Sequence, residues 1–509
     1  MKLISLVFLF CLTQVLTFGQ QRVAKIVDFD ALPQEGYDLF TIGNNIYLVY
    51  LGVCFQTNSQ NLVSCTGLIK MDQNLNFVKS IIIPDLGIGK HTVAADTLTN
   101  TIKLIGSRYD IVNDCKSYVA YDIDCEKMDF SVDVLDLKIP KDTTSEFFHR
   151  HTNIFNKKYV LSGHKFKNNT TDTQIYVLDK EHRLDTMLEI SINTSASNWE
   201  TINGRNNTLL LSILNQRPKD AFHIIRLDSL YKEVWRFVLP VEDAVVKPFF
   251  TELLNENIVL CREREVTISM QLLSVSPNKS IAWEYNFDDK SGKLDWLIFK
   301  LKTLKNGDFL VMGSHTDFTT IKEIELASVP YIARFNAMGK KLWEKSFYRT
   351  VPVLDYCIGH IRNAVELDNG DILAVGAMYN YLEYDSITKQ GRSDEDILLI
   401  RMNSLGCIDE KCENFTNITP KTTKTINSDI SAQIDVSPNP AYDVLNVVLT
   451  GKAEGLNKFN ILDMTGKQWM TGDIQGLKHV IEIQSLHNGV YMIQLTDGKQ
   501  SVTKKIVKM

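Results

Sequence analysis

The sequence predicts an all-β protein: a seven-bladed β-propeller, with six or eight blades as alternatives, followed by a small Ig-like β-sandwich. The main observation is a repeat, in which a strand of alternating apolar and polar residues is followed by an Asp, Asn or Ser turn seven times over. An Asn-rich turn and an apolar strand precede each copy, and the two markers return together about every 50 to 65 residues. A unit of four short strands at this period is typical of a propeller blade. The regular spacing argues against a pair of larger β-sandwiches.

The chain begins with a segment typical of a secretory signal peptide. Residues 1–20, MKLISLVFLFCLTQVLTFGQ, place Lys2 before an apolar run and a small residue near the end. The run is short for a membrane-spanning helix and contains Thr13 and Gln14. We therefore expect the protein to leave the cytoplasm, with a membrane anchor as the alternative.

The propeller is predicted over residues 21–412. In each repeat the short side chain of the turn residue is expected to accept hydrogen bonds from backbone amides just downstream. An aromatic residue that returns after the turn in several copies is expected to pack between neighbouring sheets. The turn residues are Asp72, Asp124, Asp179, Asp228, Ser276, Asn336 and Asn403. The returning aromatic residues are Phe77, Phe130, Trp235, Trp283 and Trp343.

Two further features concern the strands of the ring. The Asn-rich turns include Asn-Gly pairs at Asn306 and Asn369, which predict two-residue hairpins because that turn needs positive φ. The last copy loses its apolar pattern after Gly406. The strand missing there is predicted to come from the N-terminal segment VAKIVDFDAL, which would close the ring.

Polar and aromatic residues recur near the start of the innermost strand of several blades. They are His91, His149, His151, Trp199, Trp296, His360 and Arg362. Two interpretations remain open. These residues form a ligand-binding site at one mouth of the propeller, where Arg362 binds an anion and the Trp rings bind a sugar or peptide, or they are a polar lining that ties the blades together.

The sequence offers little support for a metal, a cofactor or nucleic acid. His149 and His151 lie on one face of a strand, which suits a metal, but no third ligand follows at motif spacing. Motifs of a hydrolase nucleophile, a zinc protease, a P-loop or a dinucleotide site are missing. The formal net charge of −6 opposes nucleic-acid binding. We therefore predict no metal and no cofactor, and favour a binding protein over an enzyme.

One of the nine cysteines leaves with the signal peptide, and the even number that remains permits disulfides in an exported protein. Cys54 is a candidate partner of Cys65, and Cys407 of Cys412. The other pairings are left open. Cys261, in IVLCRER, is predicted to be a buried thiol.

The composition changes after the propeller. Residues 413–433 are rich in Thr, Asn and Ser without an apolar period, which is typical of a linker. Residues 434–509 form short alternating segments separated by turn signals, which predicts a small β-sandwich. The segment TKKIVKM is predicted to be its final strand.

Short motifs stand in order in this last segment. They are Pro438, Asn439 and Pro440 in SPNP; the LNV triplet; Asp463, Gly466 and Lys467 at a turn; Leu486, Gly489 and Tyr491; and Lys504 and Lys505 in the closing strand. Together they resemble the C-terminal sorting domain of the type IX (Por) secretion system of Bacteroidetes, type A. The resemblance implies an Ig-like sandwich that is recognised by the outer-membrane translocon and removed during export. An ordinary Ig-like binding module is the alternative.

The resemblance also implies passage through the periplasm, followed by release or by attachment to surface lipopolysaccharide. The sequence thus predicts a secreted or cell-surface β-propeller protein that acts by binding a glycan, a peptide or a protein. One alternative is an extracellular hydrolase or lyase with its site at one propeller mouth. A surface scaffold without a small ligand is the other.

Overall fold

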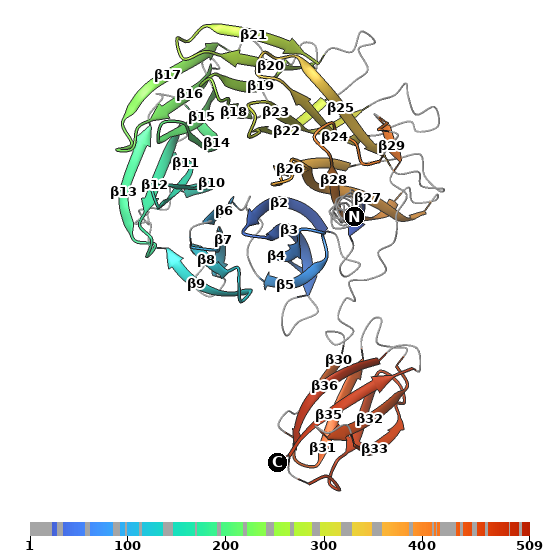
Figure 1. The fold of residues 1–509 in the computed structure, drawn as a ribbon. Coiled ribbons are helices and arrows are strands. Elements are labelled where there is room, and N and C mark those ends of the chain that lie inside the picture. Colours follow the sequence, from blue (N-terminus) through green and yellow to red (C-terminus); the bar gives the residue numbers. More distant parts are fainter. Residues whose placement is uncertain are drawn as a thin grey trace, which may run out of the picture. The chain divides into compact units, whose positions relative to one another are not determined.

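The computed structural model divides the chain into two compact units, Met1–Thr422 and Thr423–Met509 (Figure 1). The structure describes residues 23–27, 34–55, 62–84, 92–96, 99–110, 115–135, 146–167, 170–190, 195–216, 221–240, 249–264, 269–287, 296–316, 328–348, 359–385, 390–409, 412–413, 415–417, 434–437, 441–449, 456–463, 467–487, 489–497 and 501–508. The predicted signal peptide, residues 1–20, lies outside these residues. All regular elements within them are β-strands, as predicted. No helix of the described part is long and apolar enough to cross a membrane.

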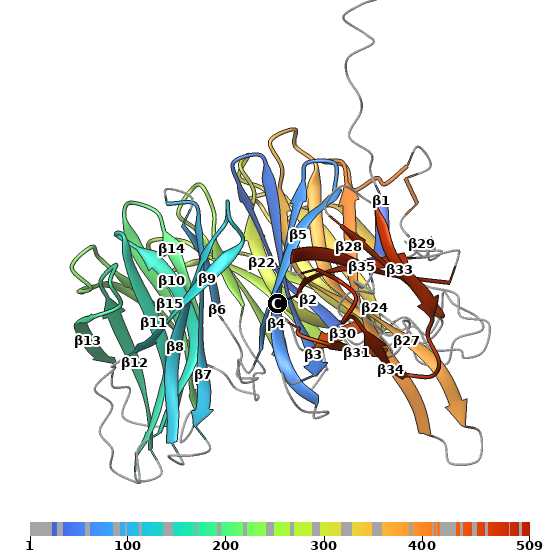
Figure 2. The same ribbon diagram turned by 90° about the horizontal axis from the view of Figure 1, so that it is seen from below.

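The described residues of the first unit form seven sheets arranged in a ring (Figure 1), and Figure 2 shows them from below. We number the sheets 1 to 7 in chain order, from β2–β5 to β26–β28. The first strand of each sheet is innermost (Figure 1). The innermost strands are β2 (Gln34–Ile42), β6 (Thr92–Asp96), β10 (Glu146–Phe155), β14 (Ser195–Gly204), β18 (Phe250–Glu252), β22 (Trp296–Thr303) and β26 (Gly359–Glu366).

The remaining strands follow outward by antiparallel pairing. The second strands are β3 (Asn45–Phe55), β7 (Thr101–Asp110), β11 (Lys158–Lys167), β15 (Thr208–Gln216), β19 (Ile258–Arg264), β23 (Phe309–Thr316) and β27 (Ile372–Asp385). The third strands are β4 (Leu62–Asp72), β8 (Cys115–Asp124), β12 (Thr170–Leu178), β16 (Ala221–Leu227), β20 (Ser269–Val275), β24 (Ser328–Phe335) and β28 (Gln390–Met402). The fourth strands are β5 (Phe77–Pro84), β9 (Asp129–Leu135), β13 (Leu184–Ile190), β17 (Glu233–Pro240), β21 (Ile281–Asn286), β25 (Lys341–Tyr348) and, in sheet 7, β1 (Val23–Val27).

Buried apolar side chains fill the spaces between neighbouring sheets. Seven such clusters occur among the described residues of this unit, and each combines side chains of two adjacent sheets. One of them closes the ring, because it joins Leu39 of sheet 1 to Val375 of sheet 7. Each sheet therefore covers the apolar face of its neighbour. This arrangement is that of a β-propeller.

The N-terminal strand completes sheet 7. β1 pairs antiparallel with β28, so that Val23 lies opposite Arg401 and Val27 opposite Ile397. The predicted closure of the ring by the N-terminal segment is confirmed. A short strand in the predicted linker, β29 (Phe415–Asn417), was not expected; it pairs in parallel with β25 and becomes a fifth strand of sheet 6.

Six of the seven turn residues of the repeat act as predicted. Ser276 is the exception, because its hydroxyl donates to the Ser280 carbonyl at 2.9 Å and Asn278 Oδ1 accepts the Ser280 amide instead. The Oδ1 atom of Asp72 accepts the amides of Asn74 and Asn76 at 2.8 and 2.9 Å. The same double acceptance by one side-chain oxygen occurs at Asp124, Asp179, Asp228, Asn336 and Asn403. These bonds fix the loop between the third and fourth strands.

At most interfaces, a backbone carbonyl of this turn also accepts a hydrogen bond from a side chain of the preceding sheet. Trp283 Nε1 donates to the carbonyl of Ala337, the residue after the turn residue Asn336, at 3.0 Å. Trp235 and Trp343 donate in the same way to Pro277 and Ser404. We call this acceptor the turn carbonyl. At other interfaces it is bound by Tyr47 and Lys70 (to Cys125), Asn156 (to Ser229) and Arg401 (to Gln73).

The Asn-Gly pairs form a different turn from the predicted one. Gly307 has a φ of 91°, but the loop closes between Leu304 and Asp308 through a 2.8 Å hydrogen bond from the Leu304 amide. Asn306 Oδ1 accepts the Asp308 amide at 3.1 Å, so Asn306 caps the loop instead of sharing a two-residue turn. Asn369 does the same for Asp371. The prediction of two-residue hairpins at Asn306 and Asn369 is therefore wrong.

The cysteines that the structure describes agree with the predictions. Cys407 and Cys412 form a disulfide, as predicted. Cys65 is also disulfide-bonded, but the side chain of its predicted partner, Cys54, lies outside the described part. Cys261 is a fully buried thiol, as predicted.

The second unit contains two sheets that share one buried cluster, which includes Leu445, Val447, Ile461 and Ile493. It is therefore a small β-sandwich, and the predicted final strand is confirmed as β36. One sheet consists of β30 (Ile434–Ser437), β31 (Val444–Leu449) and β34 (Lys478–Glu482). The other consists of β33 (Gln468–Asp473), β32 (Lys458–Asp463), β35 (Gly489–Thr496) and β36 (Ser501–Lys508).

Candidate functional site

Five of the seven innermost strands carry a β-bulge within the described residues. Each bulge inserts one extra residue, which bends the strand locally and redirects its side chains. The extra residues are Tyr37 in β2, Arg150 in β10, Trp199 in β14, Phe299 in β22 and Arg362 in β26. The bulges thus place a set of large residues along the inner rim of the ring.

Sheets 6, 7 and 1 meet at one of these places. His360 Nε2 lies 2.7 Å from Glu35 Oε1, and Arg362 Nε donates to the same oxygen. The Arg362 guanidinium lies 4.3 Å from the centre of the Phe299 ring, and His360 packs on that ring as well. The stacking and the ion pair hold the guanidinium plane in a fixed position.

A second set of contacts extends this group across further sheets. Asn363 donates to Asp38, and Lys300 forms an ion pair with Glu200 of sheet 4. Glu200 also accepts the backbone amide of Phe250 of sheet 5 at 3.2 Å. We call the combined group the axial cluster. Its members are Glu35, Tyr37, Asp38, Glu200, Phe299, Lys300, Lys302, His360, Arg362 and Asn363.

Burial and pairing shift the pKa values of the axial cluster in opposite directions. Burial raises the pKa of Glu35, but bonds from His360 and Arg362 outweigh it and leave the pKa lowered. Burial lowers the pKa of His360, which favours the neutral imidazole. Burial also raises the pKa of Tyr37 to about 12 and raises that of Asp38. His360 is buried, and Glu35, Tyr37 and Asp38 are only partly exposed, so their charged forms are poorly solvated.

Lys302 differs from the other cations of the axial cluster. Burial lowers its pKa to about 8, and the attraction of Asp38 offsets this only in part. Among the described residues no side chain forms an ion pair or hydrogen bond with its ammonium, which is partly exposed. Arg362 uses Nε for Glu35, and its terminal NH2 groups have no partner within the described part. Both groups are therefore available to an anion.

The structure brings together two of the predicted site residues, His360 and Arg362. Trp296 is elsewhere: its indole stacks on His315 with ring centres 4.7 Å apart and packs edge-on against Tyr331. His91 lies outside the described residues. His149, His151 and Trp199 lie at the bulges of β10 and β14, but their side chains are not described.

Sequence reasoning missed most of the axial cluster. Glu35, Tyr37 and Asp38 belong to β2, and none of them is among the predicted site residues. Lys300 and Lys302 follow Trp296 on the same strand. Their alternating positions predict that both side chains lie on one face of that strand. Residues two positions apart on a strand lie on the same face. Both lysines could therefore have been predicted to lie together on this innermost strand.

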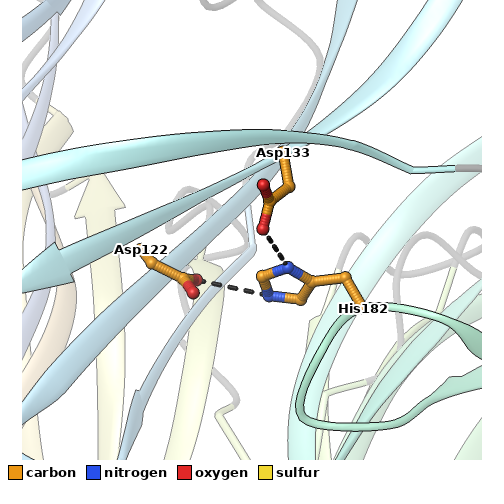
Figure 3. A group of neighbouring side chains, drawn as sticks. All are labelled: Asp122, Asp133 and His182. Atoms are coloured by element: carbon orange, nitrogen blue, oxygen red, sulfur yellow. Dashed lines mark hydrogen bonds and ion pairs between the residues drawn. The ribbon is translucent and has the colours of Figure 1, made fainter.

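A second polar group lies between sheets 2 and 3 (Figure 3). His182, in the turn after β12, points its Nδ1 at Asp133 of β9 at 2.8 Å and its Nε2 at Asp122 of β8 at 3.3 Å. One ligand atom of each lies within 4.8 Å of the others, a geometry that could hold a cation. Lys103 fills that role, because its ammonium pairs with Asp122 and lies 3.0 Å from His182 Nε2. The group therefore joins the two sheets without needing a metal.

The motif residues of the second unit divide into two kinds. Leu486 and Tyr491 are buried in the sandwich, and Gly489 begins β35. Asp463 and Lys467 flank a turn in which Asp463 Oδ1 accepts the Lys467 amide at 3.1 Å. Lys504 and Lys505 lie on β36. Pro438, Asn439, Pro440 and Gly466 lie outside the described residues.

Known proteins resemble the two units separately. Residues 435–509 match the family model described as the secretion system C-terminal sorting domain. No curated protein matches the chain.

Among solved structures, the chain is similar to the β-propeller domain of the Trilobed protease from Pyrococcus furiosus, with 12% identity, coverage of 73% of this chain and 93% of that one, and a TM-score of 0.38. It is similar to an acylaminoacyl peptidase from Pyrococcus horikoshii, with 9% identity, a TM-score of 0.41, and coverage of 85% of this chain and 61% of the peptidase. It is also similar to the polysaccharide lyase Uly1, with 8% identity, coverage of 72% and 90%, and a TM-score of 0.45.

The family match confirms the resemblance that the ordered motifs of the last segment indicate. A sorting domain implies interaction with the secretion machinery and export of the polypeptide that it follows. The protein is thus a β-propeller followed, at residues 435–509, by a type IX C-terminal sorting domain, which indicates export to the cell surface or the extracellular space.

Proposed function

We propose that the propeller is the exported cargo and that it acts by binding a ligand with a carboxylate or similar anionic group at the axial cluster. The observation that carries this proposal is Lys302, an ammonium with a pKa lowered to about 8 and no ion-pair partner among the described residues. A cation that its surroundings deprive of much of its solvation and that has no ion-pair partner is unfavourable, and an anionic ligand would supply the missing charge.

Arg362 is the second anchor of the proposed site. Its guanidinium is fixed by Glu35 and by the Phe299 ring, so little side-chain entropy is lost when an anion binds to its terminal nitrogens. Tyr37 lies within electrostatic range of Arg362 and Lys300, and its pKa of about 12 keeps the hydroxyl protonated as a donor. The site therefore suits the carboxylate of an acidic glycan or of a peptide.

Binding assays with matched acidic and neutral ligands test the proposal. Uronic-acid oligosaccharides and acidic peptides are titrated by calorimetry against the purified protein, beside their neutral counterparts. We expect the acidic ligands alone to bind, and Lys302→Gln and Arg362→Gln each to weaken binding about tenfold or more. Lys305→Gln, a change at an exposed lysine paired with Asp368, is the matched control and should bind normally. Equal binding by neutral ligands, or by Lys302→Gln, would refute the proposal.

A second candidate is an extracellular lyase or hydrolase at the same place. A lysine with a pKa near 8 is partly neutral at the pH of many environments and can accept a proton from carbon next to a carboxylate. Loss of a leaving group from the neighbouring carbon would then give a double bond. This candidate is tested by incubating the acidic ligands separately with the wild-type protein and with Lys302→Gln. An absorbance from the new double bond that appears with the wild-type protein but not with the variant supports an enzyme.

For the second unit we propose binding to the outer-membrane translocon and removal during export, with release or attachment to lipopolysaccharide afterwards. The family match supports this proposal. Deletion of residues 434–509 should leave the propeller in the periplasm. Normal surface display of the truncated protein would contradict it.

A further inference from the structure

Trp469 is an exposed aromatic side chain that is held from several directions. Its side chain is 39% exposed. Nε1 donates to Asp463 Oδ2 at 2.9 Å, and the Lys467 ammonium lies 4.5 Å from the centre of the ring. The rings of His487 and Tyr491 contact it edge-on, with centroids 6.1 and 6.4 Å away. The indole is thus fixed in one orientation while much of it faces solvent.

The residues of the sorting motif converge on this indole. Asp463 both caps the turn at Lys467 and binds Trp469 Nε1. Tyr491 is buried, and its hydroxyl donates to the backbone carbonyl of His487 at 3.0 Å. Neither Trp469 nor His487 is part of the motif. We call Asp463, Lys467, Trp469, His487 and Tyr491 the aromatic rim.

We propose that the aromatic rim is the surface by which the secretion machinery binds this sorting domain, an inference that rests on the translocon binding proposed above and tested there by deletion of residues 434–509. The partner is a protein surface that places a carboxylate on Lys467 and an apolar group on Trp469. Rigid, exposed Trp side chains dominate many protein interfaces because they bury a large area at a small loss of side-chain entropy. The Lys467 ammonium has the indole beside it and is exposed to solvent, so an acidic group can approach it.

Among the described residues of the sandwich, a second group of exposed apolar side chains lies on or next to the strands of the three-stranded sheet. Tyr442, Val444, Leu477 and Val480 are 61, 38, 50 and 57% exposed. None of these residues belongs to the motif, and within the described part no hydrogen bond or ring contact fixes their side chains. The two surfaces lie on different sheets, so changes to one serve as controls for changes to the other.

Export of the full-length chain in a bacterium with a type IX system tests the proposal. The variants are Lys467→Glu and Trp469→Ala, with Lys467→Arg as the conservative change and Val480→Thr as the control on the other sheet. We expect Lys467→Glu and Trp469→Ala to lower the surface fraction about tenfold and to accumulate in the periplasm. Lys467→Arg and Val480→Thr should reach the surface normally.

Thermal unfolding and protease resistance of the periplasmic protein separate lost recognition from misfolding. If Trp469→Ala unfolds, Lys467→Glu decides, since Lys467 is exposed and its replacement leaves the core intact. Normal export of folded Lys467→Glu would overturn the proposal. So would an equal block of export by Val480→Thr. Ligand binding by the propeller is measured separately and does not depend on this outcome.

Discussion

Single charged residues of the axial cluster show how burial and pairing compete. Burial lowers the pKa of Lys300, but the charge and hydrogen bond of Glu200 outweigh it and leave the pKa raised. Lys302, two residues along the same strand, lacks such a partner among the described residues and has a lowered pKa. The same strand thus holds one cation that is paired with Glu200 and one that has no ion-pair partner within the described part.

Replacement of Lys302 by Met should stabilise the propeller while abolishing anion binding. A lysine pKa of about 8 against a usual value of 10.5 means that the folded state binds fewer protons between these pH values. Stability therefore rises with pH across this window in the wild type, by about 1–3 kcal/mol in total. Urea unfolding at pH 7.5 and 9.5 should show this rise, and Lys302→Met should lack it. A variant that is less stable at both values would show that Lys302 has a structural partner.

Pairs of neighbouring sheets are joined by the same acceptor and different donors. The turn carbonyl accepts an indole at three interfaces and a Tyr, Lys, Asn or Arg donor at others. The acceptor is constant because the turn residue fixes the loop, whereas any long donor of the preceding sheet can reach it. The His182 group joins sheets 2 and 3 instead.

Trp283→Phe tests the hydrogen bond to the turn carbonyl at the interface of sheets 5 and 6. The ring packing is kept, but the hydrogen bond to Ala337 is lost. We expect the free energy of unfolding to fall by about 1 kcal/mol. Trp283→Ala also removes the ring, which stacks on Phe309, and should lower it by about 3 kcal/mol. Chemical denaturation measures both; identical stability of Trp283→Phe and wild type would show that the bond contributes nothing.

The contacts of His182 between sheets 2 and 3 should make the thermal stability of the propeller depend on pH. Burial lowers the pKa of His182, and so does Lys103, but the bonds from Asp122 and Asp133 leave it raised; Tyr159 packs on the same ring. A raised pKa means that the stabilisation is complete below about 6.5 and is lost as pH rises through the folded value. Thermal unfolding between pH 6 and 9 should show this loss. In His182→Gln the loss should be absent, and an unchanged pH profile would contradict the role of His182.

The sequence predicted the parts of the fold that depend on local interactions. The turn residues act within four positions of themselves, and the Cys407–Cys412 disulfide spans a separation of 5. The Asn-Gly hairpins were predicted wrongly because the Asn306 side chain competes for the loop amide. In the axial cluster, His360 meets Glu35 across 325 positions, a contact that only ring closure creates. The place of His360 and Arg362 on an innermost strand could be predicted from the sequence, but their contacts with Glu35 could not.

The whole ring is closed in two ways, by an apolar cluster and by a strand. Leu39 and Val375 belong to the cluster between sheets 1 and 7, and β1 covers the edge of β28. A strand edge that is left open exposes unpaired backbone groups. The β1 strand therefore protects sheet 7 from pairing with other chains.

Deletion of residues 23–27 should open this seam. The loss of the β1–β28 pairing is expected to lower the free energy of unfolding by about 3 kcal/mol and to promote self-association. Thermal unfolding and light scattering measure the two effects. Deletion of residues 415–417, which removes only the short parallel strand β29, is the control and should have a smaller effect. Equal effects of both deletions would show that β1 has no special part in closure.

The pairing of β1 with β28 also sets an order in time. The first strand of the ring to emerge from a ribosome or a membrane channel has its partner near the end of the propeller. β1 remains unpaired until β28 has emerged. The entropy lost in closing so long a loop then slows the pairing of the two strands. The exported chain thus completes its ring late, just before its sorting domain follows.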